Sequence, residues 1–259
     1  MNENIKKILN KKNKSKLVCL TAYSKNIASI LDKHCDIVLV GDSLGSVLYN
    51  YKSTKEVSLN TMISHSRSVR LGVKKSLMVV DMPFNTYRNP KEALKNAKLV
   101  MKKTKCDAVK LEGGKNIIPI VKRLVQNKIP VMGHVGILPQ TDKKFTFKGK
   151  KQKESNRILN DTKLLENAGA FTIVLECIET NLSKKITNQI KIPTIGIGSS
   201  SNCDGQVLVI DDLIGLSQSK LKFVKKYIDI SKIIENAVKR YKSDVLKKRF
   251  PKAKHSFNN

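Results

Sequence analysis

Polar and ionisable residues, and one glycine, recur at one kind of position in this sequence, at the end of short apolar runs. Asp81 follows the run SLMVV, and Glu176 ends the run FTIVLE. Charged groups are costly in a core and useful in a site. Any one of them alone reads as a helix cap or a turn residue. The whole set recurs too regularly for that interpretation: Thr21, Asp42, Ser43, Asp81, Lys110, Glu112, His134, Glu176 and Gly198.

Three of these residues form a donor set for a hard cation. Asp42, Asp81 and Glu112 each supply carboxylate oxygens from a different run, and no His or Cys accompanies them. Such oxygens favour Mg²⁺ over zinc and leave coordination positions for water and substrate. Lys110 lies two residues before Glu112, so both side chains point to the same side of a strand. A cation beside a metal-binding carboxylate suits a bidentate anion such as a 2-oxo acid.

Glu176 is the candidate general base. It ends an otherwise apolar run, where partial desolvation makes a carboxylate a stronger proton acceptor. The chemistry that these groups allow is proton abstraction beside a carbonyl, with a metal ion stabilising the enolate. His134 stays open between two roles, a hydrogen-bond donor to the substrate and a neutral structural imidazole.

The elements that must position these residues alternate between strands and helices. Short β-branched runs separated by amphipathic stretches are typical of βα units around a parallel sheet. We expect eight strands, at 17–21, 36–40, 76–81, 107–111, 130–133, 171–176, 193–197 and 206–210. We expect helices at 24–33, 57–71, 90–103, 116–126, 154–168 and 180–189. The connection GSSSNCDG (198–205) is too short and too rich in Gly and Ser for a helix.

This order predicts a single (β/α)₈ TIM barrel, for which 259 residues suffice. In such barrels the active site lies at the carboxyl ends of the strands, where the ionisable residues stand. We interpret residues 1–259 as one domain, with an N-terminal segment at 1–16 and C-terminal helices and tail at 212–259. Helices are expected there at 221–227 and 231–248.

Composition narrows the function classes. Fifty Lys and Arg against 21 Asp and Glu give a net charge of +29, which is typical of nucleic-acid binders. Only seven of the fifty are Arg and aromatic residues are 5%, so we favour a solvated basic surface without specific nucleic-acid binding. The five cysteines include no CxxC pair and predict reduced thiols. No apolar run is long enough for a membrane span and no secretory signal is recognisable, so we expect a cytoplasmic protein.

Eight ordered motifs resemble those of the ketopantoate hydroxymethyltransferase family. The resemblance runs from Leu17 to Phe257, and eight motifs in order are far more specific than a single Gly-rich loop. The motifs are LTAY (20–23), VGDSLG (40–45), DMPF (81–84) with Tyr87, VKLEGG (109–114), GHVGILPQ (133–140), VLE (174–176), PTIGIG (193–198) and CDGQVLV (203–209).

The resemblance implies a barrel of the phosphoenolpyruvate/pyruvate type that assembles as a homodecamer. It implies transfer of the one-carbon unit of 5,10-methylenetetrahydrofolate to 3-methyl-2-oxobutanoate, giving 2-dehydropantoate, the first step towards pantoate and pantothenate. By the same resemblance Asp42, Asp81 and Glu112 bind one Mg²⁺ per subunit. Asp42, Ser43, Asp81 and Lys110 bind the oxo acid, and Glu176 is the base.

Other observations leave alternatives open. The segment TDKKFTFKGKKQ (141–152) is shorter and poorer in Gly than the family's loop at this place, where a mobile loop acts as a lid. A Mg²⁺-dependent lyase acting on another 2-oxo acid would share the carboxylates without using folate. A basic nucleic-acid-binding protein would explain the charge but leaves the acids at the strand ends unexplained.

Overall fold

The computed structural model describes residues 3–142, 146–217 and 219–257. The chain divides into two compact units, Met1–Val209 and Ile210–Asn259, which are described separately. The interpretation of residues 1–259 as one domain stays a prediction. No helix within the described residues is long and apolar enough to cross a membrane.

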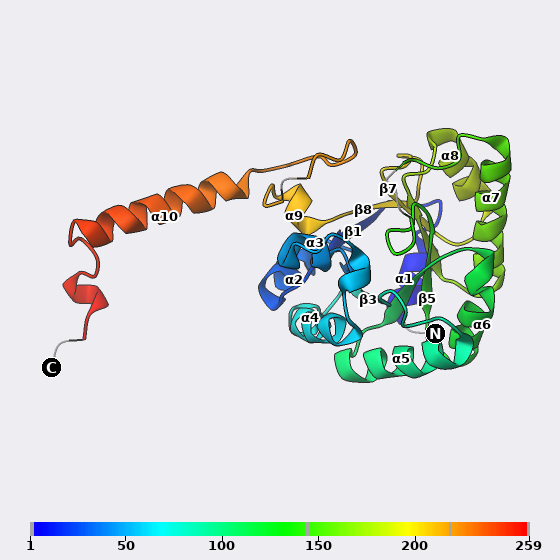
Figure 1. The fold of residues 1–259 in the computed structure, drawn as a ribbon, viewed down its shortest axis with the longest axis horizontal. Coiled ribbons are helices and arrows are strands. Elements are labelled where there is room, and N and C mark those ends of the chain that lie inside the picture. The colour runs from blue at the N-terminus through cyan, green and yellow to red at the C-terminus, as the bar shows by residue number, and fades with distance from the viewer. Residues whose placement is uncertain (1–2, 143–145, 218, 258–259) are drawn as a thin grey trace. The chain divides into compact units, whose positions relative to one another are not determined.

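The first unit is a closed barrel of eight parallel strands in sequence order (Figure 1). Each strand pairs with its sequence neighbours, and β1 pairs with β8 to close the barrel. The strands are β1 Leu17–Thr21, β2 Ile37–Val40, β3 Leu77–Asp81, β4 Ala108–Glu112, β5 Val131–Gly136, β6 Thr172–Glu176, β7 Thr194–Ile197 and β8 Gly205–Leu208. The predicted (β/α)₈ barrel is confirmed, with strand bounds that differ by at most three residues.

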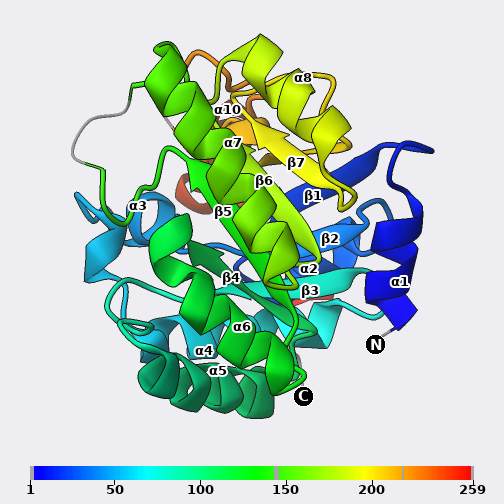
Figure 2. The same cartoon turned by 90° about the vertical axis from the view of Figure 1, so that its right-hand side faces the viewer.

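Helices surround the barrel, and Figure 2 shows α6 and α7 on its outer face, where both contact β5. All six helices predicted between strands are present: α2 Lys25–Leu31, α4 Leu59–Gly72, α5 Pro90–Thr104, α6 Ile118–Gln126, α7 Gln152–Asn167 and α8 Thr180–Gln189. Asn89 caps α5 by accepting from the Glu92 N–H, and Pro90 is its first residue. As predicted, the segment between β7 and β8 contains no helix.

Three short helical elements were not expected from the sequence. They are α3 Leu44–Tyr49 and the 3₁₀ turns Thr54–Glu56 and Lys115–Ile117. Each lies in a loop at the carboxyl end of a strand. Single turns of this length produce no sustained apolar periodicity, so the sequence pattern does not reveal them.

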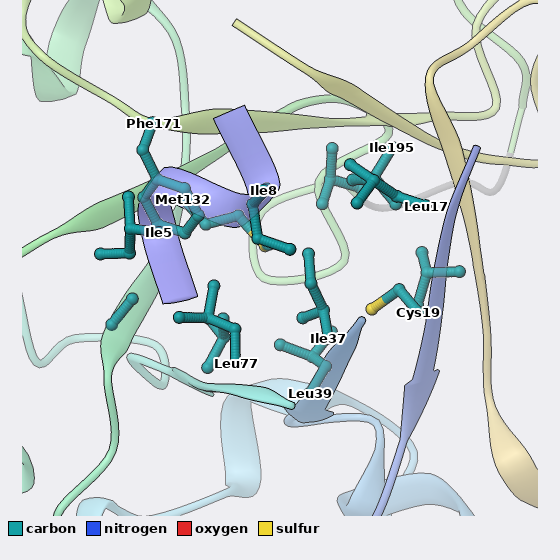
Figure 3. Close-up of a cluster of buried hydrophobic side chains, with 14 residues drawn as sticks. Ile5, Ile8, Leu17, Cys19, Ile37, Leu39, Leu77, Met132, Phe171 and Ile195 are labelled. Atoms are coloured by element: carbon teal, nitrogen blue, oxygen red, sulfur yellow. The ribbon is translucent and has the colours of Figure 1, made fainter. Parts of the chain in front are cut away.

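A fourth unpredicted helix, α1 (Glu3–Asn10), packs against the barrel core. Ile5 and Ile8 are buried among side chains from the first residues of the strands, such as Leu17 and Ile37, as Figure 3 shows. The predicted N-terminal segment 1–16 therefore contains a helix that the sequence analysis did not include. Four Lys and four Asn among the first thirteen residues obscure a stripe of only two deeply buried isoleucines.

The second unit contains α9 (Ile210–Leu213), α10 (Ile230–Leu246) and a 3₁₀ turn at Ala253–His255. The helix predicted at 231–248 is confirmed. The strand predicted at 206–210 ends at Leu208, because Ile210 already begins α9.

The helix predicted at 221–227 is wrong. The Tyr227 N–H donates to the Leu213 carbonyl and the Ile230 N–H to the Ile214 carbonyl. These bonds hold the end of the segment beside the residues that follow α9, so its backbone groups are used outside a helix.

Candidate active site

Side chains alternate between the two faces of each strand, and this alternation places the ionisable groups directly above the apolar core. Val79 and Asp81 lie two residues apart on β3, as do Met132 and His134 on β5, and the first of each pair belongs to the core cluster. Because side chains two apart on a strand share a face, the second member points into the barrel at its carboxyl end. The predicted residues therefore converge at one mouth, where five of them are buried: Asp42, Asp81, Lys110, Glu112 and Glu176.

Asp81 and Lys110 form the centre of this cluster. They are paired in the β3–β4 register, and Lys110 Nζ lies 3.1 Å from Asp81 Oδ1 and 3.9 Å from Glu112 Oε1. The backbone N–H of Asp42 donates to Asp81 Oδ2 at 3.0 Å. The three predicted metal ligands and the predicted substrate lysine are thus neighbours. The prediction that Lys110 and Glu112 share a side is confirmed.

His134 connects Glu112 to Glu176. Its Nδ1 lies 3.5 Å from Glu112 Oε1, and its Nε2 lies 3.2 Å from Glu176 Oε2. The register explains this position, because Glu112 pairs with His134 across β4–β5 and Glu176 pairs with Gly136 across β5–β6. A buried imidazole therefore faces the predicted general base.

Two residues of the site were not singled out by sequence reasoning. Gln140, in the loop after β5, donates from its side-chain amide to Asp42 Oδ2 at 2.8 Å and from its backbone N–H to Glu112 Oε2 at 3.1 Å. The Tyr87 hydroxyl donates to Gln140 Oε1. Both residues belong to the motifs GHVGILPQ and DMPF with Tyr87, which was the available signal.

Ser43 lies at the edge of the cluster. It is partly buried, directly follows Asp42 and precedes α3, and its hydroxyl is 2.9 Å from the Tyr23 hydroxyl at the end of the LTAY motif. Ser43 thus retains a partly accessible hydroxyl beside the buried carboxylates, as a substrate-binding group requires.

Burial and neighbouring charges shift the protonation equilibria of the cluster. Burial, followed by repulsion from Asp81 and Glu112, raises the pKa of Asp42 well above its usual range. Burial also raises the pKa of Asp81, although Lys110 opposes it. The pKa of Glu112 is lowered, because His134 and Lys110 outweigh the effect of burial.

For the two cationic groups, burial and the neighbouring carboxylates shift the pKa in opposite directions. Burial and Lys110 each lower the pKa of His134, but the carboxylates of Glu112 and Glu176 outweigh them and raise it to about 9. Burial likewise lowers the pKa of Lys110, but Asp81, Glu112 and Asp42 together raise it above its usual value. Both groups are therefore cationic at neutral pH.

The carboxylate oxygens of Asp42, Asp81 and Glu112 are of the chemical type that binds a hard divalent cation. Four buried carboxylates face one lysine and one histidine, so carboxyl oxygens outnumber the cationic groups that face them. Within the described residues, no three His, Cys, Asp or Glu side chains are arranged to hold a metal ion. Lys110 lies between Asp81 and Glu112 and partly balances the charge that a cation would balance.

The chain beyond Glu176 is held by the loop that follows β5. Lys148 N–H donates to the Cys177 carbonyl, and Glu179 N–H donates to the Lys148 carbonyl. The predicted lid segment 141–152 thus returns to the end of β6. Its residues 143–145 lie outside the described part of the chain.

No cysteine has the properties of a nucleophile. All five are free, and burial followed by the nearby Glu176 charge raises the pKa of Cys177, next to the predicted base, to about 12. A thiol with this pKa is protonated at neutral pH and a poor nucleophile. The absence of disulfides among these five cysteines is consistent with the prediction of reduced thiols.

Comparisons with known proteins identify relatives of the whole chain. The 3-methyl-2-oxobutanoate hydroxymethyltransferase of Pelagibacter ubique (strain HTCC1062) is 63% identical over 257 residues, which is 99% of this chain and 100% of that protein. A phosphonopyruvate hydrolase structure superimposes with a TM-score of 0.63 at 12% identity, covering 97% of this chain and 100% of the other.

A second structure, 2,3-dimethylmalate lyase of the PEP mutase/isocitrate lyase superfamily, superimposes with a TM-score of 0.58 at 12% identity. The match covers 80% of this chain and 77% of the lyase. At these identities the two structures show the fold alone. The model of the family described as ketopantoate hydroxymethyltransferase matches residues 2–253. With that match over nearly its whole length and eight strand ends converging on one acidic mouth, the chain belongs to the ketopantoate hydroxymethyltransferase family.

Proposed function

We propose that this protein transfers a hydroxymethyl group to 3-methyl-2-oxobutanoate, giving 2-dehydropantoate. The co-substrate is 5,10-methylenetetrahydrofolate, and the reaction requires one Mg²⁺ per subunit. The observation that carries the proposal is the buried cluster at the barrel mouth, in which Glu176 faces a cationic His134 beside three further carboxylates. The family supplies the reaction, and the cluster supplies the groups that the reaction needs.

The substrate carboxylate and keto oxygen bind at the barrel mouth, where Lys110 lies among the carboxylates. Lys110 supplies a fixed positive charge and Ser43 a hydroxyl, while Asp42 and Asp81, joined by a hydrogen bond, line the same space. Asp42, Asp81 and Glu112 would hold Mg²⁺, and a bound Mg²⁺ would polarise the keto group as a Lewis acid. The excess of carboxylates over cations supports this assignment.

Glu176 accepts the proton from C3 of the oxo acid. The His134 imidazole lies 3.2 Å from its carboxylate, carries positive charge at neutral pH and fixes the position of Glu176 at the mouth. The C3 carbon then bonds to the folate methylene carbon, and water helps to release 2-dehydropantoate and tetrahydrofolate. The apolar core inside the barrel excludes solvent below the mouth.

The protein acts as a homo-oligomer in the cytoplasm, for which we propose a homodecamer. Helix α10 supports an assembly, because Ile234, Val238, Tyr241 and Val245 are each more than 40% exposed at spacings of four, three and four residues. That spacing forms one apolar stripe on a helix, of the kind that a second helix covers. A second copy of this chain is the partner that supplies an identical stripe.

Proton NMR of the oxo acid in D₂O tests the proposal. With protein, Mg²⁺ and methylenetetrahydrofolate, we expect the C3 methine signal to disappear and a hydroxymethyl signal to form. Glu176→Gln should abolish both changes, because its amide cannot accept the proton. Omitting Mg²⁺ should slow both changes strongly.

Three outcomes separate the parts of the proposal. Exchange of the methine for deuterium without a hydroxymethyl product would retain Glu176 as the base and contradict folate as donor. Product formation that is unaffected by chelation would contradict the metal assignment. No change with a folded wild-type protein would contradict the substrate itself.

A further inference from the structure

Gln140 is a buried polar residue that contacts the ends of three strands in the site. It is 1% exposed and lies in the loop after β5. Its Nε2 donates to Asp42 Oδ2 at 2.8 Å and to the Met82 carbonyl at 3.0 Å, and its backbone N–H donates to Glu112 Oε2 at 3.1 Å. One residue therefore connects the ends of β2, β3 and β4, and it contacts two of the three predicted metal ligands.

The direction of its amide is set by its partners. Nε2 uses both of its hydrogens, on Asp42 and Met82, and Oε1 accepts from the Tyr87 hydroxyl. Turning the amide over would place Oε1 against a carboxylate and a carbonyl, which are both acceptors. The Tyr87 hydroxyl also lies near the Glu112 backbone N–H and carbonyl, at 3.4 and 3.5 Å, so it is itself fixed.

We propose that Gln140 is a positioning residue that fixes the carboxylates of Asp42 and Glu112 in the orientation that binds the metal ion, and that Tyr87 sets the direction of its amide. This inference rests on the proposed Mg²⁺ site. Asp42 follows β2 and Glu112 ends β4, and both repel further negative charge. Hydrogen bonds from a neutral donor hold two such groups near one another without supplying the counter-charge that a cation must supply.

The consequence is a loss of metal affinity that does not depend on loss of folding. Groups that orient metal ligands typically change metal affinity about 10–100-fold when they are removed. Gln140→Met keeps the length of the side chain and removes its amide donors, so the dissociation constant for Mn²⁺, used in place of Mg²⁺, should rise by about 10–100-fold. Tyr87→Phe should produce a smaller rise, because the amide is still present but is no longer fixed from one side.

Electron paramagnetic resonance of Mn²⁺ titrated into the full-length protein without substrate measures this directly. Thermal unfolding of each variant in a chelator reports folding separately. Asn96→Leu is the matched control, because Asn96 Nδ2 donates to the Thr86 carbonyl at 2.7 Å on the same side of the barrel and contacts no site carboxylate. It should lower the melting temperature and leave Mn²⁺ affinity unchanged.

Four results decide the matter. Weaker Mn²⁺ binding in Gln140→Met with an unfolding transition close to that of Asn96→Leu supports the inference. Equal binding in Gln140→Met and wild type overturns it and leaves the proposed metal site intact. No stoichiometric Mn²⁺ binding by the wild type overturns the metal site and this inference together. If Gln140→Met fails to fold, Gln140→Asn replaces it, because its amide is one methylene too short to reach Asp42. That variant should show the same weakening of Mn²⁺ binding. Normal Mn²⁺ affinity in Gln140→Asn overturns the inference.

Discussion

His134 lies between two carboxylates that belong to different parts of the proposed chemistry. Glu112 is a predicted metal ligand and Glu176 the predicted base, and the imidazole contacts both. With a pKa of about 9 it is cationic at neutral pH. The two carboxylate contacts favour a protonated ring over one alternative left open by the sequence, a neutral structural imidazole. A cation at this position offsets part of the repulsion between the two glutamates.

The contribution of this charge can be measured by replacing it with a neutral hydrogen-bonding group. His134→Gln should lower kcat by about 100-fold, because Glu176 loses its cationic partner, and should change KM for the oxo acid less. Steady-state kinetics of the hydroxymethyl transfer provide the check. His34→Gln, at an exposed histidine before β2, is the matched control. A kcat within twofold of wild type in His134→Gln would show that the imidazole is only a packing group.

Asp32 supports a prediction about pH and stability away from the site. Its Oδ1 accepts the backbone N–H groups of Lys75 and Ser76, both at 2.8 Å. Although burial acts in the opposite direction, these bonds lower the pKa of Asp32 below its usual value. A lowered pKa in the folded state means that the ionised form adds stability above the unfolded pKa of about 3.9, and that this stability is lost as pH falls through the folded pKa.

Asp32→Asn keeps the accepting oxygen and removes the charge. At pH 7 we expect it to lower the free energy of unfolding by about 1 kcal/mol, the difference between a charged and a neutral acceptor. That corresponds to about 2–4 °C in melting temperature for a chain of this size. The two melting curves should converge as the pH falls through the pKa of Asp32 in the folded protein. A gap that persists at low pH would mean that packing, not charge, causes the difference.

Most chemistry-bearing residues could be predicted because each is attached to a strand end. Asp81, Lys110, Glu112 and Glu176 occupy strand positions, so period-two alternation alone places them on the inner face. Gln140 and Tyr87 belong to loops, where the path of the backbone decides what a side chain reaches. Their hydrogen bonds join residues 98 and 53 positions apart, which no local pattern reveals.

At the scale of elements, the close approach of β5 and β6 positions the base. Gly136 ends β5 opposite Glu176, with φ +102°, and a Cβ built on it would lie 2.1 Å from the Glu176 carbonyl oxygen. Backbone atoms cannot move aside as a side chain can. The absence of a Cβ at position 136 is therefore a condition for the position of Glu176 on the neighbouring strand.

Gly136→Ala should lower the free energy of unfolding by about 2–4 kcal/mol, through strain at positive φ and the backbone clash, and should reduce kcat as Glu176 moves. Gly149→Ala is the matched control, because Gly149 also has positive φ, at +87°, but its Cβ would meet only the flexible end of Leu182. Chemical denaturation of both variants gives the comparison. Equal losses would show that φ strain alone matters and that β5 and β6 can separate to admit a methyl group.

Elements with a long, repeated apolar pattern were predicted well, and those held by tertiary contacts were not. The eight strands and α8 follow directly from their periodicity. Helix α1 depends on two isoleucines that insert among the barrel strands, a contact between residues far apart in the chain. The segment 221–227 has apolar residues at helical spacing, yet its end is hydrogen-bonded to the segment after α9.

At the scale of the whole molecule, the net charge of +29 and the acidic mouth have different consequences. Charge on the outside governs association with other molecules, and the buried carboxylates govern chemistry within the barrel. A basic surface of this kind attracts polyanions without specificity, and such binding weakens steeply as salt rises. A specific nucleic-acid-binding protein would therefore bind some nucleic-acid sequences more tightly than others. A solvated lysine surface does not produce such a preference.

The same charge opposes the assembly that the α10 stripe favours. Each copy repels every other copy, and the range of that repulsion falls from about 30 Å at 0.01 M salt to about 10 Å at 0.1 M. Apolar contacts are not weakened by salt in this range. We therefore expect the oligomer to become more stable as salt rises, with a larger fraction assembled at about 0.3 M than at about 0.01 M.

Sedimentation velocity at one protein concentration and several salt concentrations measures this balance between repulsion and apolar contact. Val238→Asp, in the middle of the stripe, should dissociate the oligomer at every salt concentration, because it places a charge among the exposed Ile234, Tyr241 and Val245 side chains. Lys239→Asp, at the neighbouring position of the same helix, is the matched control, since Lys239 lies beside Glu235 rather than on the stripe. It changes the charge by two in the direction that reduces repulsion, and should leave assembly intact or strengthen it. An oligomer that dissociates as salt rises would instead be held by ion pairs, and one that is unaffected by Val238→Asp would have its interface elsewhere.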